Sequence, residues 1–160
     1  LTHTKSSCRL VIIGQGRQET MFRKMAGSLG LADRVSFLGS LPHEEVGQWY
    51  AKANAVVLPV RQPESFALVG PEAMRYGTPV IATRIGGVDT WLEEKKTGLA
   101  VPPNDPQALA AAMDTLAAGN GLCKAMGETA RERYNQLFRP ERHVDALLGA
   151  FEALTQEKAV

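Results

Sequence analysis

The chain has 160 residues, of which 44% are hydrophobic and 22% charged, and its formal net charge is +1. This length suffices for one domain with a full hydrophobic core, and the balanced charge gives no support for broad binding to nucleic acid or to a membrane surface. The two cysteines, Cys8 and Cys123, lie far apart without metal-ligand spacing, so we expect reduced thiols in a cytoplasmic protein. No stretch approaches the ~18 apolar residues of a membrane span.

Short apolar runs alternate with amphipathic stretches along most of the chain. The runs at residues 9–13, 34–38, 55–58, 79–83 and 98–101 are typical of strands buried on both faces of a parallel sheet. Helices are expected at 17–29, after Pro42, from Gly70-Pro71 to Gly77, at 88–94 behind a flexible Gly86-Gly87 turn, and after Asp105-Pro106. Two further helices end the chain. The alternation predicts an α/β fold, a Rossmann-like doubly wound parallel sheet with C-terminal helices, in one domain over residues 1–160.

Apolar stripes at helical spacing predict which helix faces are buried. The first helix has Met21, Phe22, Met25 and Leu29, and the second has Val46, Trp49, Tyr50 and Ala53. The two C-terminal stripes are Leu122, Met126, Ala130 and Tyr134, then Val144, Leu147, Leu148, Phe151 and Leu154. We expect Trp49 and Tyr50 to be core residues, and His43 to be a solvated surface histidine.

The stretch 63–74 is the strongest candidate for a ligand site. An apolar strand ends before it, a short helix begins within it, and two carboxylates, Glu64 and Glu72, stand eight positions apart. Free N–H groups at such a helix start suit a phosphate, and an ionised Glu72 can accept two hydrogen bonds from a vicinal diol. On spacing alone, the pattern is explained equally well without a ligand. Glu64 would then be a surface residue, and Glu72 would only complement the helix dipole. A glycosidase carboxylate pair is a further reading, which the helix start beside it disfavours.

Gly14-Gln15-Gly16 follows the first strand and resembles the start of a dinucleotide fingerprint. The third glycine of that fingerprint would fall at position 19, where Glu19 stands. We therefore do not expect a nicotinamide or flavin site. Two interpretations of this turn remain open: it faces a phosphate, or it binds no ligand.

The residue sequence of the central stretch resembles the signature of retaining family 4 glycosyltransferases. Residues 64–74 reproduce the family's pattern of two glutamates separated by seven residues, and residues 76–82 match the part of the signature that follows. Further matches follow in the family's order at residues 10–16, 35–39, 86–87, 97–103 and 105–106. The resemblance covers nearly the whole chain and is far more specific than a lone Gly-x-Gly.

The resemblance implies a GT-B architecture, two Rossmann-like domains across a cleft, of which this chain would be the C-terminal, donor-binding half. Glu64 would be the catalytic residue at the donor sugar, and Glu72 would bind the ribose. The donor sugar and diphosphate would meet Phe66, Ala67, Leu68, Val69, Gly14 and Gly16, and the base would meet the loop of Leu38, Gly39, Ser40 and Leu41. No metal and no other cofactor is expected beside the nucleotide-sugar substrate, so protein charge and the helix start would stabilise the diphosphate.

The sequence departs from the family pattern in two places. The first βα unit of the domain, which carries an Arg and a Lys in relatives, is missing, and Arg17 or Arg61 could compensate only in part. Ala67 stands where a glycine is usual, which restricts the backbone without removing its N–H. The chain, which lacks an initiator methionine, therefore reads as a fragment whose partners are a nucleotide-sugar donor and a missing N-terminal acceptor domain. Any peripheral membrane association would come through that domain.

Three functions are consistent with this sequence. The first is the donor domain of a retaining group 1 glycosyltransferase that binds its nucleotide but is inactive alone. The second is a degenerate, non-catalytic nucleotide-binding or assembly domain. The third is a nucleotide-sugar epimerase of the same fold.

Overall fold

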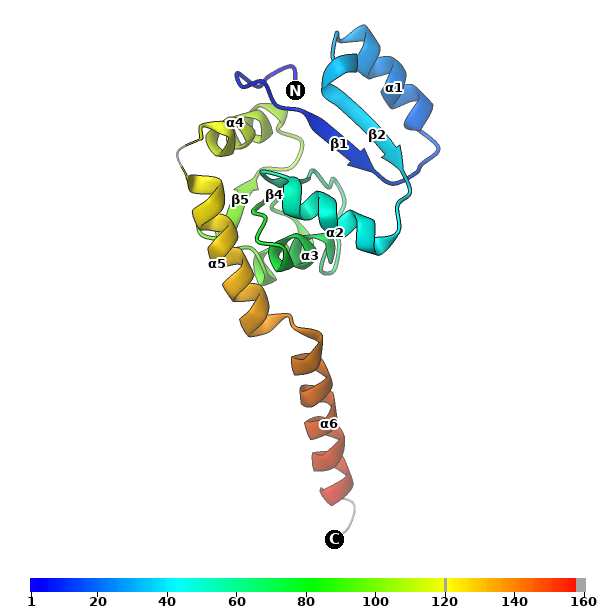
Figure 1. The fold of residues 1–160 in the computed structure, drawn as a ribbon. Helices are drawn as coiled ribbons and strands as arrows, with labels where there is room; N and C mark the ends of the chain where they lie inside the picture. The colour runs from blue at the N-terminus through cyan, green and yellow to red at the C-terminus, as the bar shows by residue number, and fades with distance from the viewer. Residues whose placement is uncertain (120, 158–160) are drawn as a thin grey trace.

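The computed structural model describes residues 1–119 and 121–157, whose strands alternate with helices as the sequence predicts (Figure 1). The strands lie within a residue or two of the expected apolar runs: β1 Leu10–Ile13, β2 Val35–Gly39, β3 Val56–Leu58, β4 Val80–Thr83 and β5 Gly98–Val101. The helices are α1 Glu19–Ser28, α2 His43–Lys52, α3 Val69–Arg75, α4 Pro106–Ala117, α5 Leu122–Leu137 and α6 Pro140–Glu157, with two 3₁₀ turns, η1 Ala32–Arg34 and η2 Gly86–Thr90.

Local chemistry explains several of these boundaries. The Asp105 side chain caps α4 by accepting from the Ala108 N–H at 2.8 Å, with Pro106 in the first turn as expected. The helices α1 and α3 stop before Gly30 and Gly77, whose φ angles of 68° and 73° lie in the left-handed region that favours glycine.

Every strand pairing in the described ranges is parallel, which confirms the α/β prediction. The described strands form two sheets, one with the order β1-β2 and one with the order β3-β4-β5. Within the described residues, β1 and β3 each pair on one side only. The carboxyl ends of β1, β2 and β3 still lead into the loops that the sequence assigns to the site.

Helices cover both faces of the three-stranded sheet. On one face, Val80 and Ala82 of β4 pack with residues of α2, α3, η2 and α5. On the other face, Ile81 packs with residues of β5, α4 and α5. The four residues of β4 are at most 4% exposed, so this strand is the centre of the core. The doubly wound arrangement is therefore present in this part of the chain.

Helix α5 runs antiparallel to α3. Gly127, near the start of α5, lies against Gly77 at the end of α3, so closely that a Cβ on Gly127 would meet the Gly77 carbonyl. Phe138, just after α5, packs against Phe66 before α3, with ring centroids 5.9 Å apart. Helix α5 therefore ends at the carboxyl edge of the sheet, and α6 leaves the body of the molecule from that edge (Figure 1).

Two of the predicted apolar faces are not buried, and for these helices the sequence prediction was wrong. In and just after α1, Met21, Phe22, Met25 and Leu29 are 43–51% exposed, and the α6 residues Val144, Leu147, Leu148, Phe151 and Leu154 are 44–62% exposed. An apolar stripe shows that a helix face needs another surface to pack against, but it does not show that the same chain supplies that surface. The stripes of α2 and α5 do contribute core residues, among them Tyr50, Met126, Ala130 and Tyr134.

The segment after β4 also differs from the prediction. Gly86 and Gly87 are not a flexible turn before a helix at 88–94, because they open the 3₁₀ turn η2, which ends at Thr90. Both cysteines are free thiols, as expected. Among the helices that the structure describes, none is long and apolar enough to span a lipid bilayer.

Candidate functional site

The candidate site begins on the loop between β3 and α3, which carries Glu64. Helix α3 starts at Val69, with Leu68 in the capping position, so it begins just before the Gly70-Pro71 start that the sequence predicts. Pro71 and Glu72 are in the first turn, where Pro71 needs no N–H partner and Glu72 lies near the positive end of the helix. Glu64 is exposed and Glu72 is half-buried.

Four consecutive backbone N–H groups on this loop are available to a ligand. Among the described residues, no group accepts a hydrogen bond from the N–H of Phe66, Ala67, Leu68 or Val69. Ala67 has a φ of 57°, in the left-handed region. For a residue with a Cβ this conformation costs about 1–2 kcal/mol, so the surrounding contacts have to impose it.

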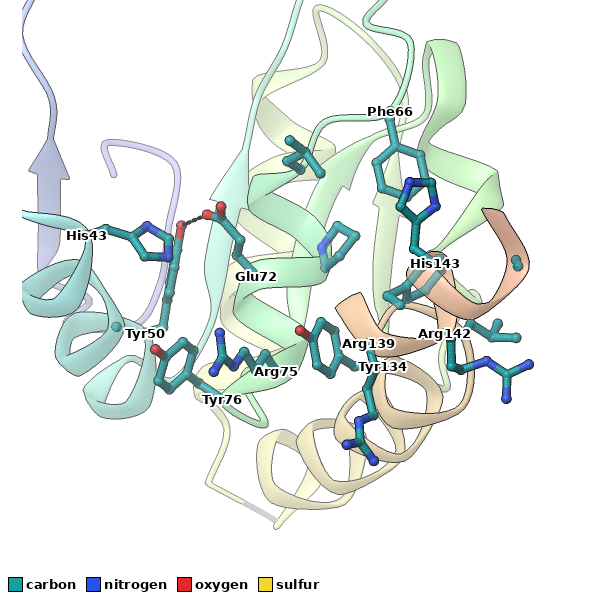
Figure 2. A pocket seen from close by; sticks show the side chains of 16 residues that line it. His43, Tyr50, Phe66, Glu72, Arg75, Tyr76, Tyr134, Arg139, Arg142 and His143 are labelled. Carbon is teal, nitrogen blue, oxygen red and sulfur yellow. Dashed lines mark hydrogen bonds between the residues drawn. The ribbon is translucent and has the colours of Figure 1, made fainter. Parts of the chain in front are cut away.

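A groove of about 690 Å³ runs along the outer side of α3, between α2 and the start of α6 (Figure 2). Three of the predicted site residues line it, namely Glu72, Phe66 and Leu68. Aromatic rings form much of its wall, from Tyr50, Tyr76, Tyr134, Phe66 and Phe138. The groove can therefore offer a carboxylate and flat apolar surfaces to the same ligand.

The Glu72 carboxylate has a partner that the sequence did not reveal. The Tyr50 hydroxyl donates a hydrogen bond to Glu72 Oε2 at 3.1 Å, and Figure 2 shows the two side chains pointing toward each other from α2 and α3. Burial raises the pKa of Tyr50 above its ordinary value, and the charge of Glu72 raises it further. Tyr50 therefore remains a protonated donor, and it holds one carboxylate oxygen while the other stays available.

Basic side chains line the part of the groove beyond Glu72. Arg75 comes from the last turn of α3, Arg139 directly precedes α6, and Arg142 and His143 lie in its first turn (Figure 2). Arg139 donates to Glu141 at 3.2 Å, and the backbone N–H of Glu141, with a smaller contribution from this guanidinium, holds the pKa of Glu141 below its ordinary value. The charge of the groove thus changes from acidic at Glu72 to basic at α6.

Glu64 lies next to the turn η2 and not in the groove. The Gly87 N–H donates to the Glu64 carbonyl at 3.0 Å. A Cβ on Gly86 would lie 2.2 Å from the same carbonyl oxygen, and one on Gly87 would lie 1.9 Å from that of Ser65. Only glycine allows this close approach of the two backbones, so the glycine pair supports the loop that carries Glu64.

The loops after β1 and β2 lie side by side. The Gly14 N–H donates to the Gly39 carbonyl at 2.7 Å, so the expected phosphate turn and the expected base loop are neighbours. A Cβ on Gly14 or Gly16 would meet no atom within 4 Å, but the φ of 126° at Gly14 favours glycine. Gly14, Gly16 and the loop Leu38, Gly39, Ser40 and Leu41 do not line the groove that contains Glu72.

The two arginines considered as substitutes for a cationic clamp differ in their surroundings. Arg61 donates to the Asn104 side chain at 2.9 Å and lines a hollow of about 340 Å³ whose wall contains none of residues 64–72. Arg17 is exposed in the turn after Gly16. In the described ranges 1–119 and 121–157, no group of three or more His, Cys, Asp or Glu side chains is arranged to hold a metal ion.

Known proteins match both the sequence and the fold. The model of the family described as glycosyl transferases group 1 matches residues 1–133. O-antigen chain mannosyltransferase C of Escherichia coli is 30% identical over 157 residues, which cover 97% of this chain and 42% of that protein. D-inositol 3-phosphate glycosyltransferase of Corynebacterium urealyticum is 43% identical over 107 residues, or 67% of this chain and 25% of that protein.

Solved structures agree with these matches. Sucrose-phosphate synthase of Thermosynechococcus elongatus superposes with a TM-score of 0.85 at 33% identity, over 93% of this chain and 39% of that chain. HepE of Anabaena, solved in complex with UDP, has a TM-score of 0.88 at 22% identity, over 95% of this chain and 43% of that chain, and supports the fold alone. The chain thus spans less than half the length of these relatives. It belongs to the group 1 glycosyltransferases, with the fold of a C-terminal GT-B domain.

Proposed function

We propose that the full-length parent protein transfers a glycosyl group from a nucleoside-diphosphate sugar with retention of anomeric configuration, and that this chain holds the donor. The observation that carries the proposal is the run of four available N–H groups, Phe66 to Val69, which ends three residues before Glu72. Backbone donors of this kind bind phosphate oxygens and sugar hydroxyls, and Glu72 suits the ribose diol. HepE, a neighbour of the same fold, has been solved with UDP-glucose, which supports this class of donor.

In the proposed reaction, the bond between the anomeric carbon and the diphosphate breaks, and the diphosphate leaves with the electron pair. The acceptor oxygen bonds to the same face of that carbon and gives its proton to the leaving diphosphate. Glu64 contacts the sugar, the N–H groups of residues 66–69 and the Gly14-Gln15-Gly16 turn receive the diphosphate, and the loop Leu38 to Leu41 receives the base. We propose that no bound metal is needed, because these backbone donors balance the developing charge.

We also propose that this chain is one half of the catalytic unit. The unpaired edges of β1 and β3 support a further parallel strand between the two sheets, as in the βα unit expected from the resemblance. The exposed stripe on α6, which leaves from the edge that carries the site, supports an acceptor domain on that side. Any peripheral membrane association would come through that domain. The two free thiols support a cytoplasmic location.

The test is a screen of the full-length parent protein against UDP-, GDP- and ADP-sugars, with and without EDTA, followed by Glu64→Gln and Glu72→Gln. A charge-assisted hydrogen bond is worth about 1.5–3 kcal/mol, so we expect the affinity for the donor to fall about 10- to 100-fold in Glu72→Gln, and the turnover to fall at least as much in Glu64→Gln. NMR of the product gives the anomeric configuration. Glu128→Gln, at an exposed position of α5, is the matched control.

Three results would overturn parts of this proposal. An active protein with unchanged Glu64→Gln and Glu72→Gln variants would remove the assigned roles, and an inverted product would remove retention. A protein that neither binds nor turns over any of these sugars would instead favour the degenerate assembly domain.

A further inference from the structure

Trp91 lies beneath the loop that carries the available N–H groups. It follows η2, its side chain is fully buried, and its indole Nε1–H donates to the Phe66 carbonyl oxygen at 2.6 Å. Resting on the function proposed above, we propose that Trp91 is a positioning residue, which fixes the peptide between Phe66 and Ala67 so that the Ala67 N–H points at the donor.

The geometry of a peptide unit makes this link direct. The peptide bond between Phe66 and Ala67 is trans and planar, so its C=O and N–H point in opposite directions. The buried indole holds the Phe66 C=O toward the core. The Ala67 N–H must then point away from the core, and none of the described residues accepts a hydrogen bond from it.

This loop needs such a restraint at this position. Ala67 has a φ of 57°, which a residue with a Cβ rarely adopts. The contacts of Gly87 with Glu64 hold the start of the loop, and the indole packs so closely on Gly70 that a Cβ there would lie 2.4 Å from the ring. Between these points, the Trp91 hydrogen bond is the contact that sets the orientation of the peptide before Ala67.

Trp91 is itself held from the opposite side. Arg133 of α5 donates from Nε to the Trp91 carbonyl at 2.9 Å and from Nη2 to the Thr90 carbonyl at 3.3 Å. Arg133 also forms an ion pair with Glu93. The indole is therefore anchored to the helix that packs against α3, and the loop is positioned relative to that rigid pair.

The decisive variant removes the N–H of Trp91 and keeps its shape. In the full-length parent protein, Trp91 is replaced by benzothienylalanine, in which sulfur takes the place of Nε1–H, and separately by Phe. A misaligned donor lowers the turnover, so we expect kcat to fall at least about tenfold. The inhibition constant of UDP should rise by a smaller factor than kcat falls, because UDP keeps its contacts with Glu72 and with the other N–H groups of the loop. The same replacements at Trp49, on α2, are the matched controls.

A second readout does not depend on activity. In the 160-residue chain labelled with ¹⁵N, benzothienylalanine at position 91 should shift the amide resonance of Ala67 more than those of Gly14 and Gly39. A variant with wild-type kcat, or with an unshifted Ala67 resonance, overturns the inference. Equal losses of kcat and of UDP affinity, with a lower melting temperature, would assign Trp91 a structural role only. A wild-type protein inactive with every nucleotide sugar contradicts the proposed function, and the Ala67 resonance still tests the geometry.

Discussion

Glu72 shows how a residue found by its spacing depends on a partner that its spacing does not reveal. Tyr50 lies 22 positions earlier and reaches Glu72 only because α2 packs beside α3. The apolar periodicity of α2 correctly predicts that the Tyr50 ring is in the core. It carries no information on the hydroxyl at the end of that ring, which is polar and faces the groove.

Substituting Tyr50→Phe in the full-length parent protein tests the role of this hydroxyl. The ring stays in the core, while Glu72 loses one hydrogen bond and can rotate away from the ribose that we propose it binds. A neutral hydrogen bond contributes about 0.5–1.5 kcal/mol, so we expect the dissociation constant of the donor to rise about 2- to 10-fold in titration calorimetry. Tyr134→Phe, also a buried tyrosine of the groove wall, should bind as wild type. Equal affinities for all three proteins would contradict a role of Tyr50 at the site.

Other residues of the site show the same limit of sequence reasoning. Local patterns place Glu64 on a loop and Glu72 in a first helical turn, and the structure confirms both positions. Trp91 has no such local signal. Its indole and the Phe66 carbonyl are 25 positions apart, and only the packing of η2 under the loop brings them together. Contacts of this kind depend on the tertiary fold, which a periodicity does not encode.

At the scale of elements, the first residues of the chain connect its two sheets. Asp114 of α4 accepts hydrogen bonds from the backbone N–H groups of Lys5 and Ser6 and from the Ser6 hydroxyl. Arg34, at the end of η1, donates to the carbonyls of Cys8 and Ser6 at 3.0 and 3.2 Å. The segment before β1 is thus attached to α4 on one side and to η1 on the other.

The attachment through Asp114 should make the stability of the chain depend on pH. The Lys5 N–H, followed by the Ser6 hydroxyl and N–H, lowers the pKa of Asp114 from 3.8. A depressed folded-state pKa gives a stabilisation that is full above the unfolded-state value and is lost as pH falls through the folded-state value. In thermal unfolding of the 160-residue chain, we expect Asp114→Asn to melt a few degrees below wild type at pH 7, and we expect this difference to shrink as the pH falls below 3.8.

The control for this measurement is Asp145→Asn, at an exposed carboxylate of α6. It should follow the wild-type curve at every pH. If the difference between wild type and Asp114→Asn is the same at pH 7 and at pH 3, the carboxylate charge of Asp114 does not account for the attachment.

At the scale of the whole molecule, the sequence predicts the elements better than it predicts what covers them. The strands, the parallel pairing and the α4 cap follow from local chemistry and were predicted. The division into two sheets was not predicted, because the apolar sequences of β1 and β3 are typical of buried strands inside a sheet. In the described structure, each of these strands pairs on one side only. Edge strands normally carry charges or prolines that block further pairing. The four residues of β1 are Leu, Val, Ile and Ile, so this strand has the composition of an interior strand at an unpaired edge.

The exposed stripe on α6 should make the isolated chain associate with itself. Phe151 is 62% exposed at the centre of the stripe, and contiguous apolar patches of this kind mark interaction surfaces. Burying one such side chain is worth about 1.5–3 kcal/mol, so Phe151→Glu should raise the dissociation constant of self-association by about tenfold or more. Sedimentation velocity of the 160-residue chain over a range of concentrations measures this constant. Ala153→Glu places the same charge on the opposite side of α6 and should associate as wild type. A chain that sediments as a monomer at every concentration, or two variants that associate equally, would show that the stripe does not drive self-association.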